Sequence, residues 1–286
     1  MKRFIVFVLV CLCVLNVNAQ VKNCIGQKVV RKIEMYAAKS VKPYILIHFN
    51  YDNSLKLEEI VFTTPSKNKK VWRKENDALT HTEYYENGDL RTDLVYNYTI
   101  INGIVAECSV DNIRVDNNVL RYSYSYHYNI NKRLLCADRR VYFRENYQDF
   151  VELSDRYREL FGWDENNNVF TSGEKGWQWK EGQRFNYSVD YDNRTYYKEL
   201  KNDTNIDFSS LYLNIKNYDR FEMVTEWFGM HSSNLIETDN LRYFDYTYDN
   251  EYGGNDLSEE RGNIVQIDMY NQDKRLETTY KIYYWE

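Results

Sequence analysis

Hydrophobic and polar residues alternate along most of this chain, which is the pattern of β-strands. Residues 121–128 show it most clearly, because tyrosine fills every second position and polar residues fill the others: Arg121, Tyr122, Ser123, Tyr124, Ser125, Tyr126, His127 and Tyr128. Successive side chains of a strand point to opposite faces of its sheet. We therefore predict a strand here with one tyrosine face and one polar face.

A repeated turn motif separates the alternating segments. A tyrosine, an Asp/Asn-rich turn, a basic or polar residue and an apolar restart follow one another, most fully at 128–134 and 270–276 and more loosely at 51–55, 85–90 and 191–194. The pairs Asn87-Gly88 and Asn102-Gly103 add two turns of the sequence that most strongly favours type I′ hairpins. The chain is therefore predicted to fold as a string of β-hairpins.

The predicted fold is mainly β, a large curved antiparallel meander that forms a half-barrel or an open barrel of successive hairpins. Residues 27–37 fit either a first strand or a short helix. The remaining predicted strands are 44–51, 57–63, 81–85, 90–101, 104–106, 121–128, 134–143, 185–190, 195–200, 206–215, 221–228, 241–248, 263–270 and 276–285.

One segment departs from alternation and predicts a central amphipathic helix at 149–161. Its apolar residues recur at helical spacing: Phe150, Leu153, Tyr157, Leu160 and Phe161. A polar, Asn- and Gly-rich loop follows at 164–176. A single domain over 20–286 is thus expected, with halves at about 20–148 and 177–286 joined by the helix and loop of 149–176.

Residues 1–19 have the pattern of a signal peptide. Lys2 and Arg3 precede an unbroken apolar run at 4–15, and Ala19 provides the small residue before a cleavage site at Gln20. No later segment approaches the roughly 20 apolar residues of a transmembrane helix. The sequence predicts an exported protein of the periplasm or the cell surface.

Composition narrows the function. The formal net charge is −6, and the signal peptide carries two of the 37 basic residues and no acidic one. An acidic chain is a poor match for nucleic acid, which requires basic patches. The basic residues at 67–70 are interpreted as a solvated loop. With 2 prolines against 28 tyrosines, the chain suits long sheets.

Three cysteines follow the signal peptide: Cys24, Cys108 and Cys136. Their pairing stays open, because an odd number leaves one thiol over. The predicted strand order places the tyrosine strand between Cys108 and Cys136. Two strand spacings are about 9.6 Å, which exceeds the Cα separation that a disulfide allows.

The chain carries no recognisable catalytic motif. Nucleophile-elbow, zinc-protease and nucleotide-binding motifs are absent from the sequence, and no cofactor is predicted. We expect a protein that is not an enzyme. A weak calcium candidate is the Gly-Gly loop with Asp249, Glu251 and Asp256, for which a long solvated hairpin loop is the alternative.

Tryptophan provides the best binding hypothesis. Trp177 and Trp179 are two residues apart and share one face of an extended segment, and Trp163 precedes the same loop. Exposed indole rings stack on sugar rings. The alternative is that these side chains pack in the core against the predicted helix.

The C-terminal third resembles a known protein family. The segments 205–208 (Asn-Ile-Asp-Phe), 226–229 (Glu-Trp-Phe-Gly) and 233–236 (Ser-Asn-Leu-Ile), with the final Tyr/Asp hairpins, are similar to those of exported Bacteroidetes-type proteins of unknown function. The turns are also similar to YD-repeat hairpins. The resemblance covers about 185–286 and implies a porin-like, curved antiparallel sheet without catalytic residues. This chain departs from that pattern in its longer acidic loop at 249–260.

Together these features predict an exported, non-catalytic binding or structural module that recognises glycan or protein at the cell envelope. Two alternatives remain open: an envelope carrier that holds an apolar ligand in a half-barrel, and a polysaccharide hydrolase with a carboxylate pair in a cleft. No nucleic-acid partner and no membrane span are expected. The oligomeric state stays open.

Overall fold

A computed structural model describes most of the chain. The described residues are 28–64, 66, 68–75, 78–113, 118–145, 148–180, 183–208, 225–229, 231–239, 241–249 and 262–285. Within them, the description of 154–157, 170–180, 183–193 and 226 covers the backbone alone. The signal-peptide prediction and Cys24 lie outside the described residues.

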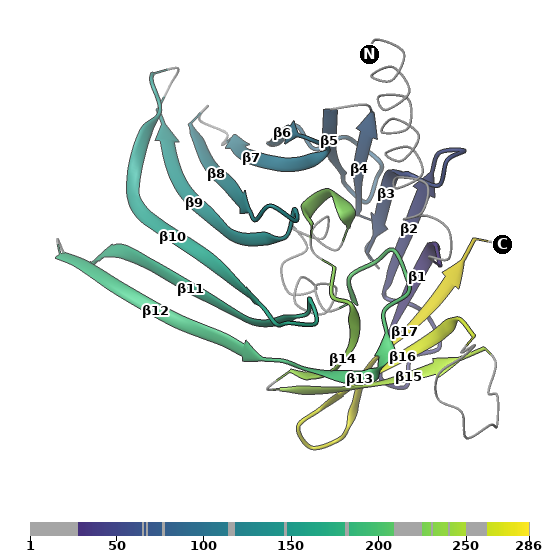
Figure 1. The fold of residues 1–286 in the computed structure, drawn as a ribbon. Helices are drawn as coiled ribbons and strands as arrows, with labels where there is room; N and C mark the ends of the chain where they lie inside the picture. Colours follow the sequence, from purple (N-terminus) through teal and green to yellow (C-terminus); the bar gives the residue numbers. More distant parts are fainter. Residues whose placement is uncertain are drawn as a thin grey trace, which may run out of the picture.

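Strands from both ends of the chain form a ten-stranded antiparallel sheet (Figure 1). Its strands, in spatial order, are β13 (Thr195–Lys201), β14 (Asn234–Asp239), β15 (Arg242–Tyr248), β16 (Ile264–Asn271), β17 (Leu276–Tyr284), β1 (Val30–Ala37), β2 (Ile45–Tyr51), β3 (Leu57–Thr63), β4 (Lys69–Glu75) and β5 (Ala78–Tyr84). The first and last described strands are thus neighbours, because β17 pairs with β1.

The middle of the chain forms a second, seven-stranded antiparallel sheet. Its strands, in spatial order, are β12 (Gln183–Asn193), β11 (Val169–Lys180), β10 (Val151–Trp163), β9 (Leu134–Arg144), β8 (Val119–Tyr128), β7 (Ile104–Ile113) and β6 (Leu94–Ile101). The predicted antiparallel, mainly β architecture is confirmed. The predicted single meander is wrong, because strand pairing stops between β5 and β6 and again between β12 and β13. The strands do not close into one barrel.

The hydrophobic core lies between the two sheets. Alternate residues of the first sheet point into it, such as Ile45, Ile47 and Phe49 on β2, which are all buried. The short 3-10 helix η2 (Glu226–Phe228) lies between the sheets in Figure 1, near β7. Phe228 packs edge-on against Tyr126 of β8, with ring centroids 5.1 Å apart. The tyrosine face of β8 is therefore the inward face.

The repeated Tyr-Asx motif forms one recurring hairpin turn. In it, an Asp or Asn side chain accepts hydrogen bonds from the backbone N–H groups two and four residues later, and the third residue after the Asx has positive φ. This geometry occurs at Asp52, Asn129, Asp164 and Asn271. The prediction of Asx hairpins is confirmed at 51–55, 128–134 and 270–276. Asn102 and Gly103 also both have positive φ, as a type I′ turn requires.

The predicted central helix at 149–161 is wrong. The segment is strand β10, which pairs with β9 on one side and β11 on the other. Its register slips between Glu152 and Arg156, so that four residues of β10 correspond to two of β9. Such a bulge interrupts the period of two. The apolar residues on either side of it then fall at spacings of three and four, which imitates a helix.

The predicted hairpin at 85–90 is confirmed as a tight turn, because the Tyr85 N–H donates to the Asp89 carbonyl, the Arg91 N–H donates to the Glu83 carbonyl, and Tyr84 forms an antiparallel bridge with Leu90. Its ladder ends there, before the chain enters the second sheet. The predicted hairpin at 191–194 is wrong. At 191–194, β12 and β13 belong to different sheets, and Arg194 between them is buried. Residues 226–228, which were predicted as part of a strand, form a 3-10 helix. In the predicted strand 206–215, Ile206 and Phe208 are buried but lie outside any strand. Residues 209–224 lie outside the described part of the chain.

A buried carboxylate joins the two sheets where the ladder breaks. Glu83 on β5 has 4% side-chain exposure and accepts a hydrogen bond of 2.8 Å from the Tyr96 hydroxyl on β6. Lys70 of β4 and Arg91 of the connecting segment each lie 3.0 Å from its oxygens. Strand β4 includes Lys69 and Lys70, so the loop interpretation of 67–70 does not hold for that pair. We call Lys70, Glu83, Arg91 and Tyr96 the joint cluster.

His81 fills the space beside this cluster. Its ring lies between Trp72, at a centroid distance of 4.3 Å, and Tyr96, at 3.7 Å. Burial, and secondarily the charge of Lys70, lowers the pKa of His81 well below its ordinary value. The neutral imidazole therefore acts as a packed aromatic ring that connects β4 and β5 to β6.

Cys108 of β7 and Cys136 of β9 lie on either side of β8, and no disulfide links them. Cys108 pairs in register with Tyr124, whereas Cys136 pairs with His127. Because Tyr124 and His127 are an odd number of residues apart, the two thiols belong to opposite sheet faces. Burial raises the pKa of Cys136.

The outer face of the first sheet carries a carboxylate that stabilises the fold at neutral pH. Burial alone would raise the pKa of Glu34, but hydrogen bonds from Tyr36, Lys32 and Tyr283 outweigh it and lower the pKa to about 2. The two hydroxyls lie 2.6 and 2.8 Å from the Glu34 carboxylate. A carboxylate with a lowered folded-state pKa contributes stability above its unfolded pKa and loses it as the pH falls toward the folded value.

We expect Glu34→Gln to lower the free energy of unfolding by about 1 kcal/mol at pH 7, since solvent screens this surface cluster. The difference from wild type should shrink as the pH falls from about 4.5 toward 2. Urea unfolding at several pH values measures it. Glu58→Gln, an exposed acid on β3, is the matched control. A pH-independent difference would contradict the assigned role of Glu34.

Candidate functional site

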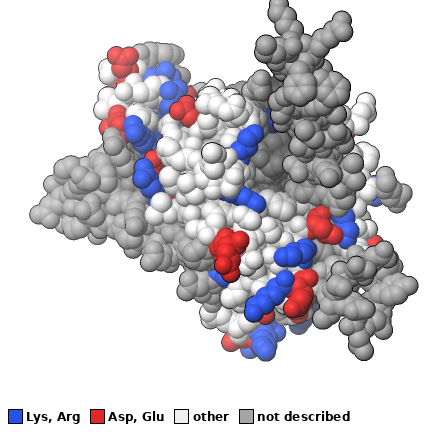
Figure 2. Space-filling model, viewed as in Figure 1, with Lys and Arg blue, Asp and Glu red and all other residues white. Residues whose placement is uncertain are grey.

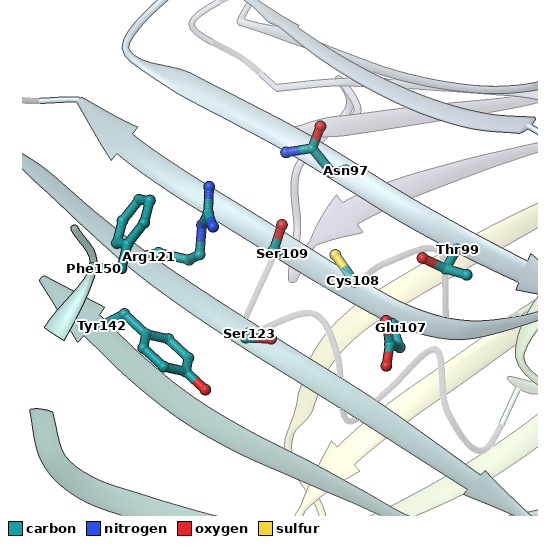
Figure 3. A pocket seen from close by; sticks show the side chains of 9 residues that line it. All are labelled: Asn97, Thr99, Glu107, Cys108, Ser109, Arg121, Ser123, Tyr142 and Phe150. Carbon is teal, nitrogen blue, oxygen red and sulfur yellow. The ribbon is translucent and has the colours of Figure 1, made fainter. Parts of the chain in front are cut away.

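A polar hollow of about 360 Å³ lies on the second sheet (Figure 3). The residues that line it come from β6 to β9 and from the segment before β10: Asn97, Thr99, Glu107, Cys108, Ser109, Arg121, Ser123, Tyr142 and Phe150. Figure 3 shows Phe150, Arg121 and Tyr142 toward one end, Thr99 and Glu107 toward the other, and the two serines between them. The hollow is therefore a slot across several strands.

The strand register explains why this face is polar. Asn97 pairs with Ser109, Ser109 with Ser123, and Ser123 with Arg140. Directly opposed residues of antiparallel strands share a face. This row alternates along the strands with the inward-facing row of Tyr124, to which Cys108 belongs. The other lining residues of β6 to β9 belong to the outward-facing rows, so the hollow opens on the face opposite the core.

Arg121 shapes the first end of the slot. Its Nε and Nη2 donate to both oxygens of Asp111, at 2.6 and 2.8 Å. The guanidinium also stacks on the Phe150 ring at 3.9 Å, and Arg144 covers that ring from 4.7 Å. The carboxylate of Asp111 raises the pKa of Arg121, which stays charged. Arg121 and Phe150 thus form one wall of the slot. Nη1 is the guanidinium nitrogen that makes no hydrogen bond to Asp111.

Glu107 marks the other end. It is exposed on β7, between Thr99 of β6 and Ser125 of β8 in register. No described residue forms an ion pair or a hydrogen bond with its carboxylate. The slot between these ends presents hydroxyl and amide groups, so its chemistry suits a ligand with many hydrogen-bonding groups.

Of the three tryptophans suggested by the sequence, Trp163 is a packing residue in this structure. Its Nε1 donates to the Leu134 carbonyl at 2.8 Å, and the Arg133 guanidinium lies 4.8 Å from its ring. The ring also packs against the core between the sheets. Trp163 is thus partly buried, and its indole N–H is already bonded to the backbone.

The side chains of Trp177 and Trp179 lie outside the described part of the structure. Their backbone belongs to β11, where Trp177 pairs with Arg156. Arg156 in turn pairs with Arg140, which continues the row of Ser123. The backbone position of Trp177 is thus in the same row across the sheet as the floor of the slot.

The calcium candidate is only partly within the structure. Asp249 accepts hydrogen bonds from the backbone and side-chain nitrogens of Asn263, at 2.8 and 3.1 Å, which closes the base of its loop. Glu251 and Asp256 lie outside the described residues. Among the residues that are described, no three His, Cys, Asp or Glu side chains form a group that could hold a metal ion.

His127 belongs to a surface ion cluster on the same face as the slot. Its Nε2 lies 3.1 Å from Asp138, which also accepts a hydrogen bond of 2.7 Å from Arg158. The hydrogen bond from Arg158 lowers the pKa of Asp138 and outweighs its burial. This cluster stabilises pairing between β8, β9 and β10.

Sequence reasoning missed the residues that line the hollow. Ser123 and Arg121 were assigned to a polar strand face, but that face was not distinguished from ordinary solvated surface. Phe150 was assigned to a helix. The signal that was present is the concentration of small hydroxyl residues on three neighbouring strands, which leaves space above the sheet.

Positively and negatively charged side chains do not form separate patches on the surface in view. Figure 2 shows Lys and Arg side chains interspersed with Asp and Glu on the face in view. None of the helical segments in the described part of the chain has the length and apolarity of a transmembrane helix.

Comparison with known proteins identifies the fold. No family model and no curated protein matches the sequence. A porin-like protein from Bacteroides uniformis aligns with a TM-score of 0.47 at 11% identity, over 90% of this chain and 98% of that one. A porin-like protein from Bacteroides vulgatus aligns with a TM-score of 0.55 at 13% identity, over 90% of this chain and 99% of that one. The two-sheet architecture described above is therefore similar to the fold of the Bacteroides vulgatus porin-like protein.

Proposed function

We propose that this chain is an exported, non-catalytic binding module of the cell envelope, and that the hollow on β6 to β9 binds carbohydrate. The observation that supports this is its lining of hydroxyl, amide and aromatic groups on one rigid sheet face. Sugars present hydroxyl groups around a ring whose faces are partly apolar. Such ligands match a site with several polar groups and a few aromatic rings.

The cellular location in this proposal rests on two observations. Residues 1–19 have the pattern of a signal peptide. The fold is similar to that of a porin-like protein from Bacteroides vulgatus. A location in the periplasm or at the cell surface fits both.

The lining supports binding over catalysis. Glycosidic bond hydrolysis commonly uses two carboxyl groups on either side of the bond. Glu107 is the one carboxylate among the lining residues, and nearby Asp111 is held by Arg121. The space between the sheets offers less support for an apolar-ligand carrier, because Phe228, Trp227 and Val105 pack there as buried core.

We extend the proposed site along the sheet to Trp177 and Trp179. The row that contains Ser123 and Arg140 continues through Arg156 to position 177. A glycan branch that leaves the middle of the slot across the strands would follow this row toward β11. Indole rings there would add stacking to the hydrogen bonds of the slot.

Glycan-array screening followed by calorimetry tests the proposal. We expect wild type to bind a defined set of oligosaccharides, and Tyr142→Ala to weaken binding about three- to tenfold, as loss of an aromatic contact does. The double variant Trp177→Ala, Trp179→Ala should weaken the binding of branched oligosaccharides more than that of linear ones.

Tyr243→Ala is the matched control, because Tyr243 is an exposed tyrosine on β15 of the other sheet. It should leave affinity unchanged. An array without glycan binding, or equal losses in Tyr142→Ala and Tyr243→Ala, would remove the hollow as a carbohydrate site.

A further inference from the structure

The charges around the slot are not spread evenly along it. Arg121 is neutralised by the bidentate carboxylate of Asp111. The Glu107 carboxylate is exposed, and none of the described cations pairs with it. The two lysines near the adjoining β6–β7 turn are engaged elsewhere, since Lys74 donates to the Gly103 carbonyl at 3.2 Å and Lys132 to the Asn102 carbonyl at 3.0 Å. Arg144 adds a positive charge beside Phe150 at the first end. The negative charge of Glu107 therefore stands at the opposite end of the slot, where none of the described cations pairs with it.

The two ends also differ in what they offer a ligand. At the Arg121 end, Nη1 is a donor without a partner among the described residues, and it suits a hydroxyl or carbonyl oxygen. At the Glu107 end, the carboxylate is an acceptor for two or more donors. A ligand that spans the slot is thus oriented, with acceptor groups toward Arg121 and donor groups toward Glu107.

The length of the slot favours an oligosaccharide. Glu107 and Asp111, the partner of Arg121, are four residues apart on β7, which is about 13 Å along a strand. This span exceeds a single pyranose ring. A chain of linked sugars would reach both ends while its middle rings lie over Ser109 and Ser123.

We propose that the hollow selects oligosaccharides that carry a free amino group, with the ammonium of the amino sugar on the Glu107 carboxylate. This inference rests on the proposed carbohydrate-binding function. A charge-assisted hydrogen bond between ammonium and carboxylate is stronger than the neutral one that an acetylated amine can donate. The acetyl group would also remove the positive charge that balances Glu107.

Calorimetry with two matched ligands tests the selection. The purified protein is titrated at about pH 6 with a glucosamine oligomer and with the N-acetylglucosamine oligomer of equal length. We expect the free-amine oligomer to bind about three- to tenfold more tightly. In Glu107→Gln the two affinities should become equal. Because Glu107 is exposed and has no described partner, this variant should fold as wild type does.

One control variant separates the slot from general attraction of a polycation to an acidic protein. Glu86→Gln removes an exposed charge in the 85–89 turn, outside the lining of the slot, and should leave the amine preference intact. An equal loss in Glu86→Gln and Glu107→Gln would show non-specific attraction and would overturn the inference.

The remaining outcomes distinguish this inference from the proposed function. If both oligomers bind wild type equally, or if only uncharged glycans bind, the amine preference is wrong and the carbohydrate site stands. If no glycan binds at all, the proposed function fails and the inference fails with it.

Discussion

Replacing Gly229 with alanine is expected to destabilise the protein by about 2–5 kcal/mol. Gly229 follows η2 with φ of 61°, in the left-handed region that costs other residues about 1–2 kcal/mol. A Cβ at this position would lie 2.0 Å from the Lys132 carbonyl oxygen and 3.4 Å from the Tyr128 ring. Overpacking of this kind adds roughly 1–3 kcal/mol.

The clash involves backbone on both sides, which limits relaxation. Lys132 is itself at positive φ in the Asx turn that joins β8 to β9. Its N–H donates to the Asn129 carbonyl at 3.0 Å. Moving the carbonyl away from residue 229 would therefore disturb the turn. Urea unfolding followed by circular dichroism measures the loss.

Gly88→Ala is the matched control for Gly229→Ala. Gly88 has φ of 88°, but a Cβ there meets nothing within 4 Å. This variant should show backbone strain alone, about 1–2 kcal/mol. If the two alanine variants unfold at the same urea concentration, the close packing of η2 against the 128–133 turn is not a source of stability.

Local features of the fold could be predicted from sequence because local chemistry decides them. The Asx turns at Asp52, Asn129 and Asn271 follow from a side chain that bonds the backbone two and four residues later. Strand β8 follows from strict alternation over eight residues. Neither feature depends on which strand becomes the neighbour.

Features that depend on distant partners could not be predicted. The division into two sheets occurs where β5 fails to pair with β6, and the turn sequence Asn87-Gly88 at that point favours a hairpin. The bulge in β10 is defined by its pairing with β9, which the sequence of β10 alone does not reveal. Glutamate is usually a surface residue, and only the partners Lys70, Arg91 and Tyr96 explain why Glu83 is buried.

The candidate site was hidden for a related reason. Ser109, Ser123 and Thr99 are ordinary residues of a solvated strand face. They form a slot only because three strands bring small side chains side by side, with Phe150 at one end. The tryptophans stood out by residue type, yet Trp163 is used to cover the Leu134 carbonyl. Residue type alone therefore does not separate packing from binding in a chain so rich in aromatics.

The joint cluster leads to the second large expected effect. We expect Glu83→Gln to lower the free energy of unfolding by about 3–5 kcal/mol, the range for breaking a buried ion pair by removing one partner. Lys70 and Arg91 would then lose the carboxylate between them, and Arg91 would keep only its pair with Asp93. Glu86→Gln, an exposed neighbour in the following turn, should change stability by less than about 0.5 kcal/mol. Chemical unfolding of both variants measures the difference.

The strands that lose protection first in Glu83→Gln show whether Glu83 connects the two sheets or stabilises the whole protein. Glu83 lies on the edge strand β5, and its Tyr96 partner lies on β6, so the pair connects two sheets whose strands do not pair with each other. Hydrogen exchange in Glu83→Gln should therefore accelerate first in β5 and β6, while β16 and β17, at the centre of the first sheet, keep their protection. Uniform acceleration in all strands would mean that the two sheets unfold as one unit and that Glu83 is not their specific connection.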